Sequence, residues 1–334
     1  MNFFKNKSIL ITGGTGSFGS KLLGYLLKLK SNKPKKVIVF SRDELKQFEL
    51  MKIYPEKNYP AVRYFLGDIR DKQRLKMAFE DVDYVIHAAA LKQVPTAEYN
   101  PIEFVKTNVI GSQNIIEAAI ELNVKKVIAL STDKASSPIN LYGATKLCAD
   151  KLFLSANTLV GKKKTSFSVV RYGNVFGSRG SVIPFFLDLI SKKQKLIITD
   201  PEMTRFNIDL DDAVKLVLNA TKNSVGGEIF VPKISSYRIM DIVKAIQNNN
   251  DIKIVGIRPG EKLHEELISR AEGYNTFDLG SFFIIAGNEK SIRICKKRKY
   301  KKFKVGWNYN SLDNPFLTIT QIKKLIENYK KLRS

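Results

Sequence analysis

The sequence has few of the residues that build disulfides and zinc sites. Its 334 residues include two cysteines, Cys148 and Cys295, two histidines and one tryptophan. Two cysteines cannot form a disulfide framework, and this Cys/His count almost excludes a structural zinc centre. We therefore expect a thiol-reducing compartment and no bound metal.

Long apolar runs are also missing. No uninterrupted run approaches the roughly 20 residues that span a bilayer, and the N-terminus lacks the layout of a signal peptide. At the same time 44% of the residues are apolar and 10% are aromatic, which excludes a disordered chain. These features predict a cytoplasmic enzyme of one or two domains without a membrane span.

Acidic residues are scarce relative to basic ones. Lys and Arg number 56 against 32 Asp and Glu, a formal charge of +24. This charge attracts nucleic acid, acidic membrane surfaces or phosphorylated ligands, but it also fits lysines spread over a solvated surface. The densest cluster, 296–304, has aromatic residues between its cations and no nucleic-acid fold motif around it. We expect a basic loop or edge hairpin there, and no nucleic-acid partner.

Short apolar strands alternate with helical patterns in the first half. Alternation of this kind predicts an α/β fold with a Rossmann-type, doubly wound parallel sheet. Beyond residue 180 the rhythm loosens, so we expect a dinucleotide-binding domain over 1–180, rejoined by some later segments, and a substrate-binding lobe with a basic tail over 181–334. The predicted strands are 7–12, 37–40, 64–66, 84–88, 127–130 and 168–171, and the predicted helices are 20–30, 108–122, 142–156, 184–193, 211–222 and 236–247.

A glycine-rich loop follows the first strand directly. Gly13, Gly16 and Gly19 form the pattern G-x-x-G-x-x-G, and a helix comes next. Such a loop permits a tight turn, a close backbone approach to a pyrophosphate, and a helix N-terminus that receives it. Because strand, loop and helix all occur in order, the pattern predicts a dinucleotide site rather than an ordinary turn. The loop residues assigned to it are Gly13, Thr15, Gly16, Ser17, Phe18 and Gly19.

The end of the second strand favours NADP over NAD. An acidic residue closing this strand takes the ribose 2′-OH of NAD, whereas an arginine suits a 2′-phosphate. Here Ser41 and Arg42 come first, and Lys46 lies one helical turn beyond Arg42. After the third strand, Asp68 is placed to meet adenine or to cap a helix, and both can hold. The assigned residues are Ser41, Arg42, Asp43, Glu44, Leu45, Lys46, Asp68 and Ile69.

Two further patterns suggest the chemistry. Tyr142 and Lys146 are four residues apart and share one helix face. A lysine ammonium beside a phenol favours phenolate, which would let Tyr142 act as a base. Thr132, Asp133 and Lys134 follow a strand at the sheet edge where doubly wound folds bind ligands. Taken alone, the Asp133–Lys134 pair could equally be a surface ion pair in a loop.

Together these features resemble the extended short-chain dehydrogenase/reductase superfamily, and within it the configuration-inverting UDP-N-acetylglucosamine 4,6-dehydratases of pseudaminic acid biosynthesis. The resemblance runs from about residue 5 to about 285, with a further similar segment at 307–311. It is carried by the segments GGTGSFG (13–19), SRDELK (41–46), HAAALK (87–92), STDKASSPINLYGATK (131–146), VRYGNVFGSRG (170–180), MTRF (203–206) and RPGEKLHE (258–265).

Related branches fit less well. Classical hexose 4-epimerases have another pair where Asp133 and Lys134 stand, and retaining dTDP-glucose-type dehydratases carry Asp-Glu there. A membrane-anchored branch and a soluble epimerase branch have methionine in place of Tyr142. A UDP-hexose 4-epimerase, or a 4,6-dehydratase/5-epimerase for another deoxysugar, stays open as an alternative.

The resemblance implies roles for the chemical site. Tyr142, assisted by Lys146, takes the proton from sugar O4 while the C4 hydride passes to NADP+. Lys134 acts as base at C5, which requires a depressed pKa, and Asp133 protonates the departing C6 hydroxyl, which requires a raised pKa from burial. Thr132 hydrogen-bonds the substrate. The division of acid and base roles between Asp133 and Lys134 remains open at this point.

The resemblance also implies a nucleotide-sugar site and an oligomer. Arg205 and Arg258 would hold the UDP diphosphate, because an arginine fork suits phosphate oxygens. A homo-oligomer, often a hexamer, is implied. Gln93 and Asn207 depart from the expected pattern, which puts substrate identity in question. The remaining implied contacts are Asn174, Glu261 and Lys92 with the substrate, and Ala88, Lys92, Thr107, Tyr142, Lys146 and Val175 with the cofactor.

Overall fold

The computed structural model describes residues 3–178, 180–246 and 252–331. Its centre is a ten-stranded sheet in the order β16-β14-β15-β10-β6-β5-β4-β1-β2-β3. The seven strands from β10 to β3 pair in parallel, and the other three are antiparallel. The strands are β1 (Ser8–Thr12), β2 (Lys36–Ser41), β3 (Val62–Leu66), β4 (Tyr84–His87), β5 (Lys126–Thr132), β6 (Ser166–Tyr172), β10 (Glu228–Pro232), β14 (Thr276–Asp278), β15 (Phe282–Ala286) and β16 (Lys301–Lys302).

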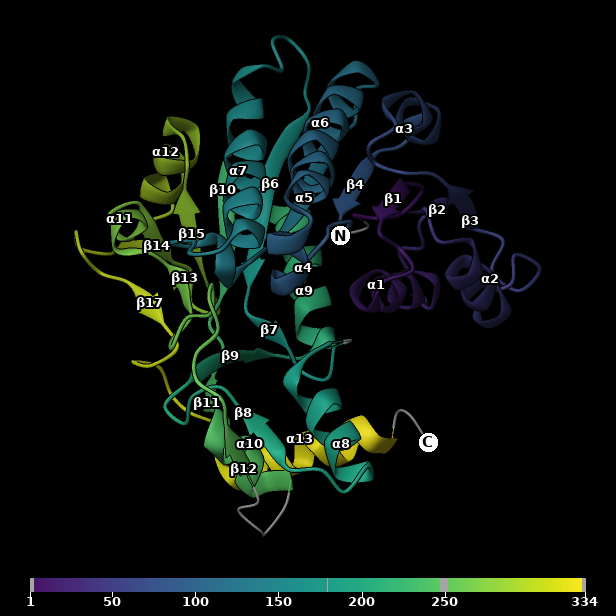
Figure 1. Ribbon diagram of the computed structural model, residues 1–334. Helices are drawn as coiled ribbons and strands as arrows, with labels where there is room; N and C mark the ends of the chain where they lie inside the picture. The colour runs from purple at the N-terminus through teal and green to yellow at the C-terminus, as the bar shows by residue number, and fades with distance from the viewer. Residues whose placement is uncertain (1–2, 179, 247–251, 332–334) are drawn as a thin grey trace.

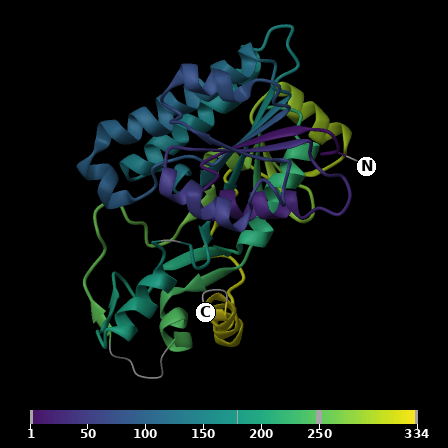
Figure 2. The same cartoon turned by 90° about the vertical axis from the view of Figure 1, so that its right-hand side faces the viewer.

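Helices cover both faces of this sheet, as Figures 1 and 2 show. Alternate strand residues point to opposite faces, so Ile9 and Ile11 join one buried cluster and Leu10 joins the other. The first cluster includes α1 (Ser17–Leu27), α9 (Leu210–Asn223) and Cys295 of α12 (Glu289–Lys297). The second includes α3 (Lys72–Phe79), α6 (Gly111–Glu121) and α7 (Leu141–Ser155). The predicted doubly wound α/β fold is confirmed.

Several short helices connect these elements. The stretch predicted as one helix over 108–122 begins earlier and contains a π-helical turn, a feature often found near functional sites. Four of the longer helices were not predicted, namely α2 (Glu44–Ile53), α3, α12 and α13 (Ile319–Lys331). The connecting helices are α2 (Glu44–Ile53), α4 (Val94–Tyr99), α5 (Pro101–Phe104), the π-helix η1 (Val105–Ile110), the 3₁₀ turns η2 (Asp133–Ala135) and η3 (Ala156–Thr158), and α11 (Arg270–Gly273).

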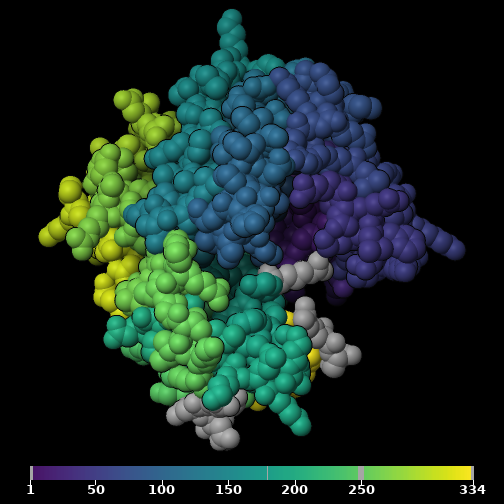
Figure 3. Space-filling view, in the orientation of Figure 1, coloured from purple at the N-terminus to yellow at the C-terminus, as the bar shows by residue number. Residues whose placement is uncertain are grey.

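A smaller lobe lies below the carboxyl ends of the parallel strands (Figure 1). It has its own apolar cluster, formed by helices α8, α10 and α13 with strand β8. Figure 3 shows a hollow where the N-terminal part of the sheet domain faces this lobe. The elements are β7 (Asn174–Val175), α8 (Val182–Ser191), β8 (Leu196–Ile198), β9 (Thr204–Ile208), β11 (Ser236–Arg238), α10 (Ile239–Ile246), β12 (Ile252–Ile254) and α13 (Ile319–Lys331). The strands β13 (Glu266–Ile268) and β17 (Tyr309–Asn310) pair with each other, and Leu267, Ile268 and Tyr309 pack in the second cluster of the main sheet. The predicted end of α10 at 247 lies outside the described residues.

The basic segment 296–304 lies at the end of the sheet. Its first residues end α12, and Lys301 and Lys302 form the edge strand β16, paired antiparallel to β14. Exposed lysines on an edge strand discourage pairing with another chain. Within the described residues, every helix is too short or too polar to span a bilayer.

Candidate active site

The glycine loop has the backbone geometry that a dinucleotide requires. Gly13 has φ of +65°, and a Cβ atom there would lie 2.8 Å from the backbone nitrogen of Ala89. A Cβ on Gly19 would lie 2.6 Å from the carbonyl oxygen of Gly13. Only glycine fits at either position, because the first needs a left-handed backbone and both are in contact with neighbouring main chain. The loop is thereby held tightly between β1, β4 and α1.

Helix α1 begins without a side-chain cap. Gly16 is its N-cap residue, and the first turn contains no acidic residue. The first N–H groups of the helix therefore lack a partner from within the helix, and its positive end favours an anion. Thr15 Oγ1 lies 2.8 Å from Ser41 Oγ, which fixes the loop to the end of β2. These residues fit a dinucleotide pyrophosphate.

The end of β2 carries an arginine rather than an available carboxylate. The Asp43 carboxylate caps α2 by accepting from Lys46 N at 3.0 Å and also pairs with the Lys46 ammonium. Arg42 has a side chain that is 53% exposed, with Nη1 3.6 Å from Asp68. Asp68 also pairs with Arg70, and although burial opposes it, these cations lower the Asp68 pKa. A 2′-phosphate would meet Arg42 at this edge.

Residues further along the cofactor path are largely buried. His87 Nδ1 lies 2.8 Å from Thr12 Oγ1, and burial, with the charge of Lys146, lowers the His87 pKa to about 3. His87 is thus a neutral histidine of the core. Ala88 N donates to Thr12 O at 3.2 Å, and Ile69 packs against Gly111. Thr107, in the π-helix, is buried and its hydroxyl lacks a hydrogen-bond partner among the described residues, which fits a polar group of a ligand.

The Asp133–Lys134 pair lies at the carboxyl end of β5. Asp133 is 1% exposed, and its Oδ1 accepts from Thr132 Oγ1 at 2.9 Å and from Lys134 Nζ at 3.1 Å. Burial raises the pKa of Asp133, as predicted for the acid. It is therefore not the surface ion pair that the sequence alone left possible.

The expected depressed pKa of Lys134 is wrong for this geometry. Burial lowers the pKa of Lys134, but the carboxylates of Asp133 and Glu265 outweigh burial and raise it above its ordinary value. The charge of Arg205 also acts to lower this pKa, but it does not reverse the result. A base role for Lys134 therefore requires that it first give up a proton to its surroundings.

The expected effect of Lys146 on Tyr142 also differs. Lys146 Nζ donates to the carbonyl of Leu130 at 2.8 Å. Burial raises the pKa of Tyr142 to about 12, although the charge of Lys134 and a hydrogen bond with Thr132 oppose this. Lys134, not Lys146, is the cation that acts on the phenol. The two helix residues nevertheless share the face of α7 that lies against the end of β5.

Glu265 was quoted in the sequence analysis but given no role. It is 2% exposed, and its Oε1 lies 3.1 Å from Lys134 Nζ and 3.8 Å from Arg205 Nε. The segment before β13 brings it there from the distant 258–265 stretch. In the sequence, Glu265 was marked only by its place in the 258–265 segment, directly before the short strand β13.

The predicted diphosphate residues Arg205 and Arg258 lie in the smaller lobe and its loops, whereas Lys92 lies between β4 and α4 of the sheet domain. Arg205 donates to the carbonyls of Thr204 and Leu263, and its side chain is mostly buried, not a solvated surface arginine. Arg258 is half exposed and faces Glu261 at 3.9 Å. Arg205 lies on β9, and Arg258 lies in the loop that precedes β13.

Asn174 and Asn207 face each other across a strand pair. They are register partners in the parallel pair β7–β9. Each has a buried side-chain oxygen without a hydrogen-bond partner among the described residues. Asn207 was a departure from the family pattern, and the structure places it beside the predicted substrate residue Asn174. Val175 follows on the same short strand.

A second buried ionic network supports the floor of the site. Arg171, which is fully buried, pairs with Asp150 at 3.2 Å and with Glu272 at 3.0 Å. Asp150 also accepts from Ser131 Oγ at 2.8 Å. The network ties α7, which carries Tyr142, to β6 and α11. This network was not predicted, because Asp150, Arg171 and Glu272 come from distant parts of the chain and form no sequence motif.

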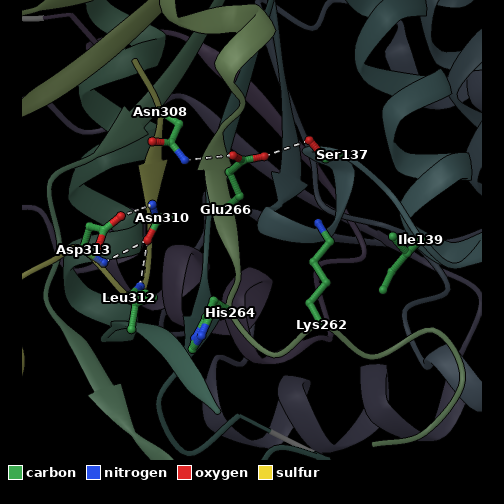
Figure 4. A pocket seen from close by; sticks show the side chains of 9 residues that line it. All are labelled: Ser137, Ile139, Lys262, His264, Glu266, Asn308, Asn310, Leu312 and Asp313. Carbon is green, nitrogen blue, oxygen red and sulfur yellow. Dashed lines mark hydrogen bonds between the residues drawn. The ribbon is translucent and has the colours of Figure 1, made fainter. Parts of the chain in front are cut away.

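A cavity of about 400 Å³ is lined by alternate residues of the 262–266 segment, on the side away from Lys134 (Figure 4). Glu266 points into it and accepts from Ser137 Oγ at 2.8 Å and from Asn308. His264 also lines it, and its Nδ1 lies 2.9 Å from Thr204 Oγ1. Neighbouring residues of this segment thus alternate: Glu265 contacts Lys134, whereas Glu266 faces the cavity.

The fold and this site define a nucleotide-binding enzyme of the extended short-chain dehydrogenase/reductase class. The family described as polysaccharide biosynthesis protein matches residues 9–287, and the chain belongs to this family. The inverting UDP-N-acetylglucosamine 4,6-dehydratase of Campylobacter jejuni serotype O:2 is 53% identical over 93% of this chain and 94% of that protein. The resemblance seen in the sequence motifs is confirmed.

Other similar proteins share the family or the fold but bear the names of other enzymes. The UDP-glucose 4-epimerase of Rickettsia felis is 42% identical over 97% of this chain and 96% of that protein. The structure of Pen from Bacillus thuringiensis matches with a TM-score of 0.88 and 41% identity, covering 98% and 99% of the two chains. The dTDP-glucose 4,6-dehydratase DesIV from Streptomyces venezuelae, solved with NAD, has a TM-score of 0.71 at 19% identity over 98% of both chains, which shows the same fold.

Proposed function

We propose that the protein is a UDP-N-acetylglucosamine 4,6-dehydratase that inverts C5. Its product would be UDP-2-acetamido-2,6-dideoxy-β-L-arabino-hexos-4-ulose, formed by net loss of water. The observation that carries this proposal is the buried Asp133–Lys134 pair beside Tyr142, in a chain 53% identical to an inverting enzyme of this activity. We further propose a cytoplasmic homo-oligomer.

The proposed cofactor is NADP, for which Arg42 and Ser41 supply the 2′-phosphate contacts and the start of α1 the pyrophosphate contacts. When bound, the cofactor accepts the C4 hydrogen of the sugar with its electron pair and later returns it to C6. Tyr142 would act as the phenolate and receive the O4 proton, so that a C4 ketone is left. The ketone acidifies the neighbouring C5–H bond. No external reductant is consumed over the cycle.

The elimination then needs one base and one acid. Lys134, as a free amine, takes the C5 proton, and the electron pair forms the C5–C6 double bond as the C6–O bond breaks. Asp133 gives a proton to the departing oxygen, so that water leaves. After C6 is reduced, C5 receives a proton on the opposite face, which inverts the centre. Thr132, hydrogen-bonded to both Asp133 and the phenol, would orient the sugar oxygen.

The nucleotide would lie between the sheet domain and the smaller lobe. Arg205 and Arg258 carry fixed positive charge suited to the diphosphate. Glu261, placed beside Arg258, would accept from the uridine ribose, and Asn174 and Lys92 would contact the sugar. The unpartnered oxygens of Asn174 and Asn207 suit donors on the substrate, such as a hydroxyl or the acetamido N–H.

A UDP-hexose 4-epimerase is the second candidate. The 42% identity to a Rickettsia UDP-glucose 4-epimerase over nearly the whole chain favours it. Such an enzyme would use Tyr142 and the cofactor but would have no need of Asp133 as an acid. A 4,6-dehydratase/5-epimerase for another deoxysugar differs only in the substrate.

Product analysis separates these activities. Purified protein is incubated with UDP-N-acetylglucosamine, without added reductant, and the product is examined by mass spectrometry. The proposal expects a product lighter by one water, and its loss in Tyr142→Phe and Asp133→Asn. A C4 epimer of unchanged mass, still formed by Asp133→Asn, would establish the epimerase instead.

A further inference from the structure

One ammonium group serves two buried carboxylates at this site. Lys134 Nζ lies 3.1 Å from Asp133 Oδ1 and 3.1 Å from Glu265 Oε1. Asp133 is 1% exposed and Glu265 is 2% exposed. The second oxygens of both, Asp133 Oδ2 and Glu265 Oε2, are buried without a hydrogen-bond partner among the described residues. Two buried negative charges that share one ammonium also repel each other, so a proton on one carboxylate stabilises the site.

The surroundings decide which carboxylate stays charged. Glu265 has a second cation, since Arg205 Nε lies 3.8 Å from its Oε1, and the ammonium of Lys262 also acts on it. Asp133 has Lys134 as its paired cation and Glu265 as a repelling negative charge, and Lys262 acts on it more weakly than on Glu265. Although burial opposes ionisation at both, the pKa of Glu265 is lowered and that of Asp133 is raised. The phenols of Tyr142 and Tyr237 also face this cluster.

We propose that Glu265 is a positioning residue that determines which member of the Asp133–Lys134 pair acts as the acid. In the resting site it takes the lysine ammonium as its ion-pair partner, and Asp133 therefore holds the proton that it delivers to the C6 oxygen. Lys134 releases its own extra proton before it acts as the base at C5. This inference rests on the proposed dehydratase function and goes beyond it, because it names the group that keeps Asp133 protonated for its acid role. Glu265 itself touches Lys134 and not the reacting sugar atoms in this account.

Glu265→Gln should uncouple two steps of the reaction. The amide keeps the size and an accepting oxygen but removes the negative charge, so Lys134 is left with Asp133 as its only carboxylate. Asp133 then ionises and no longer serves as an acid. Proton exchange at C5 needs Tyr142 and Lys134 but not an acid at C6, so it should continue. We expect water loss to fall at least about tenfold more than C5 exchange, within the range of general acid catalysis.

The experiment compares wild type, Glu265→Gln, Glu265→Asp and Glu266→Gln, each loaded with NADP. In deuterated water, deuterium at C5 of recovered UDP-N-acetylglucosamine and the rate of product formation are measured by NMR over a range of pH. Glu266→Gln is the matched control, because it makes the same change one residue away on a side chain that points into the cavity (Figure 4). The aspartate variant should restore part of the water loss.

A second readout needs no turnover. The infrared band of a protonated carboxyl, isolated by subtracting the spectrum of Asp133→Asn, should be present at neutral pH in wild type and absent in Glu265→Gln. An equal fall of both rates in Glu265→Gln, with the band retained, would overturn the proposal. So would the same uncoupling in Glu266→Gln. If wild type forms no dehydrated product, the proposed function fails, and the infrared comparison still decides the role of Glu265.

Discussion

Asn140 holds helix α7 and the loop of Arg258 together. Its side-chain oxygen accepts from Gly143 N at 2.7 Å, which caps the helix, and its side-chain nitrogen donates to the carbonyl of Gly260 at 2.7 Å. Lys262 adds a 2.6 Å hydrogen bond to the carbonyl of Ser136 close by. The start of the helix that carries Tyr142 is thereby joined to the loop that carries a predicted diphosphate contact.

This double role can be separated by two substitutions of Asn140. Asn140→Ala should destabilise the protein by about 1–2 kcal/mol, through loss of the cap, and raise KM for the sugar nucleotide. Asn140→Asp keeps the cap acceptor but cannot donate to Gly260, so it should raise KM with little change in urea-unfolding free energy. Equal KM for wild type and Asn140→Asp would show that the loop is positioned by other contacts.

The phenol of Tyr142 should titrate far above the range of a working base until ligands bind. Its pKa of about 12 follows from burial. The ultraviolet difference spectrum of wild type minus Tyr142→Phe should show this transition near pH 12 without ligand. NADP+ carries a positive nicotinamide ring and should move the transition to lower pH than NADPH does. A transition near pH 10 without ligand, unmoved by either form, would contradict this.

Arg42 should determine the choice between the two cofactors. Arg42→Ala removes a charge-assisted contact to the 2′-phosphate and should weaken NADP binding by about tenfold or more, with NAD binding little changed. Lys52→Ala is the control, because it removes an exposed cation from the last turn of the same helix, away from the predicted cofactor contacts. Titration calorimetry with both cofactors measures the effect. An equal loss for NADP and NAD would mean that Arg42 does not contact the 2′-phosphate.

His87 should make stability depend on pH on the acidic side. Its folded-state pKa of about 3 lies below the ordinary 6.5, so the unfolded chain takes the proton first as the pH falls. Its contribution is complete above pH 6.5 and is lost between pH 6.5 and 3, at about 1.4 kcal/mol per pH unit. Urea unfolding at several pH values should give a slope shallower by this amount in His87→Asn. Parallel slopes would indicate that His87 is protonated in the folded protein.

The sequence was informative where local pattern and structure coincide. The six predicted strands are present because continuous apolar runs can be buried on both faces of a parallel sheet. Helix α2 was missed because its apolar residues Leu45, Phe48 and Met51 are exposed, while its buried residues are Gln47 and Leu50, which form no apolar stripe. The strands β14, β15 and β16 join the main sheet through long-range pairing, which local periodicity does not encode.

At the site, the sequence motifs identified most of the side chains but not the pKa directions of their titratable groups. The glycine loop and Asp133, Lys134 and Tyr142 could be proposed from spacing and resemblance. Glu265 could not, because a single acidic residue in a loop has no characteristic spacing. The pKa directions of Lys134 and Tyr142 were mispredicted. The carboxylates of Asp133 and Glu265 outweigh burial at Lys134, and burial raises the pKa of Tyr142, while Lys146 donates to the Leu130 carbonyl.

The central claim is tested most directly by the configuration at C5. UDP-N-acetylglucosamine is incubated with the NADP-loaded enzyme in deuterated water, and the product is examined by NMR before it can epimerise in solution. The account predicts a 4-keto-6-deoxy sugar of L-arabino configuration with deuterium at C5. A dehydrated product that keeps the original configuration would contradict inversion and remove the base role of Lys134.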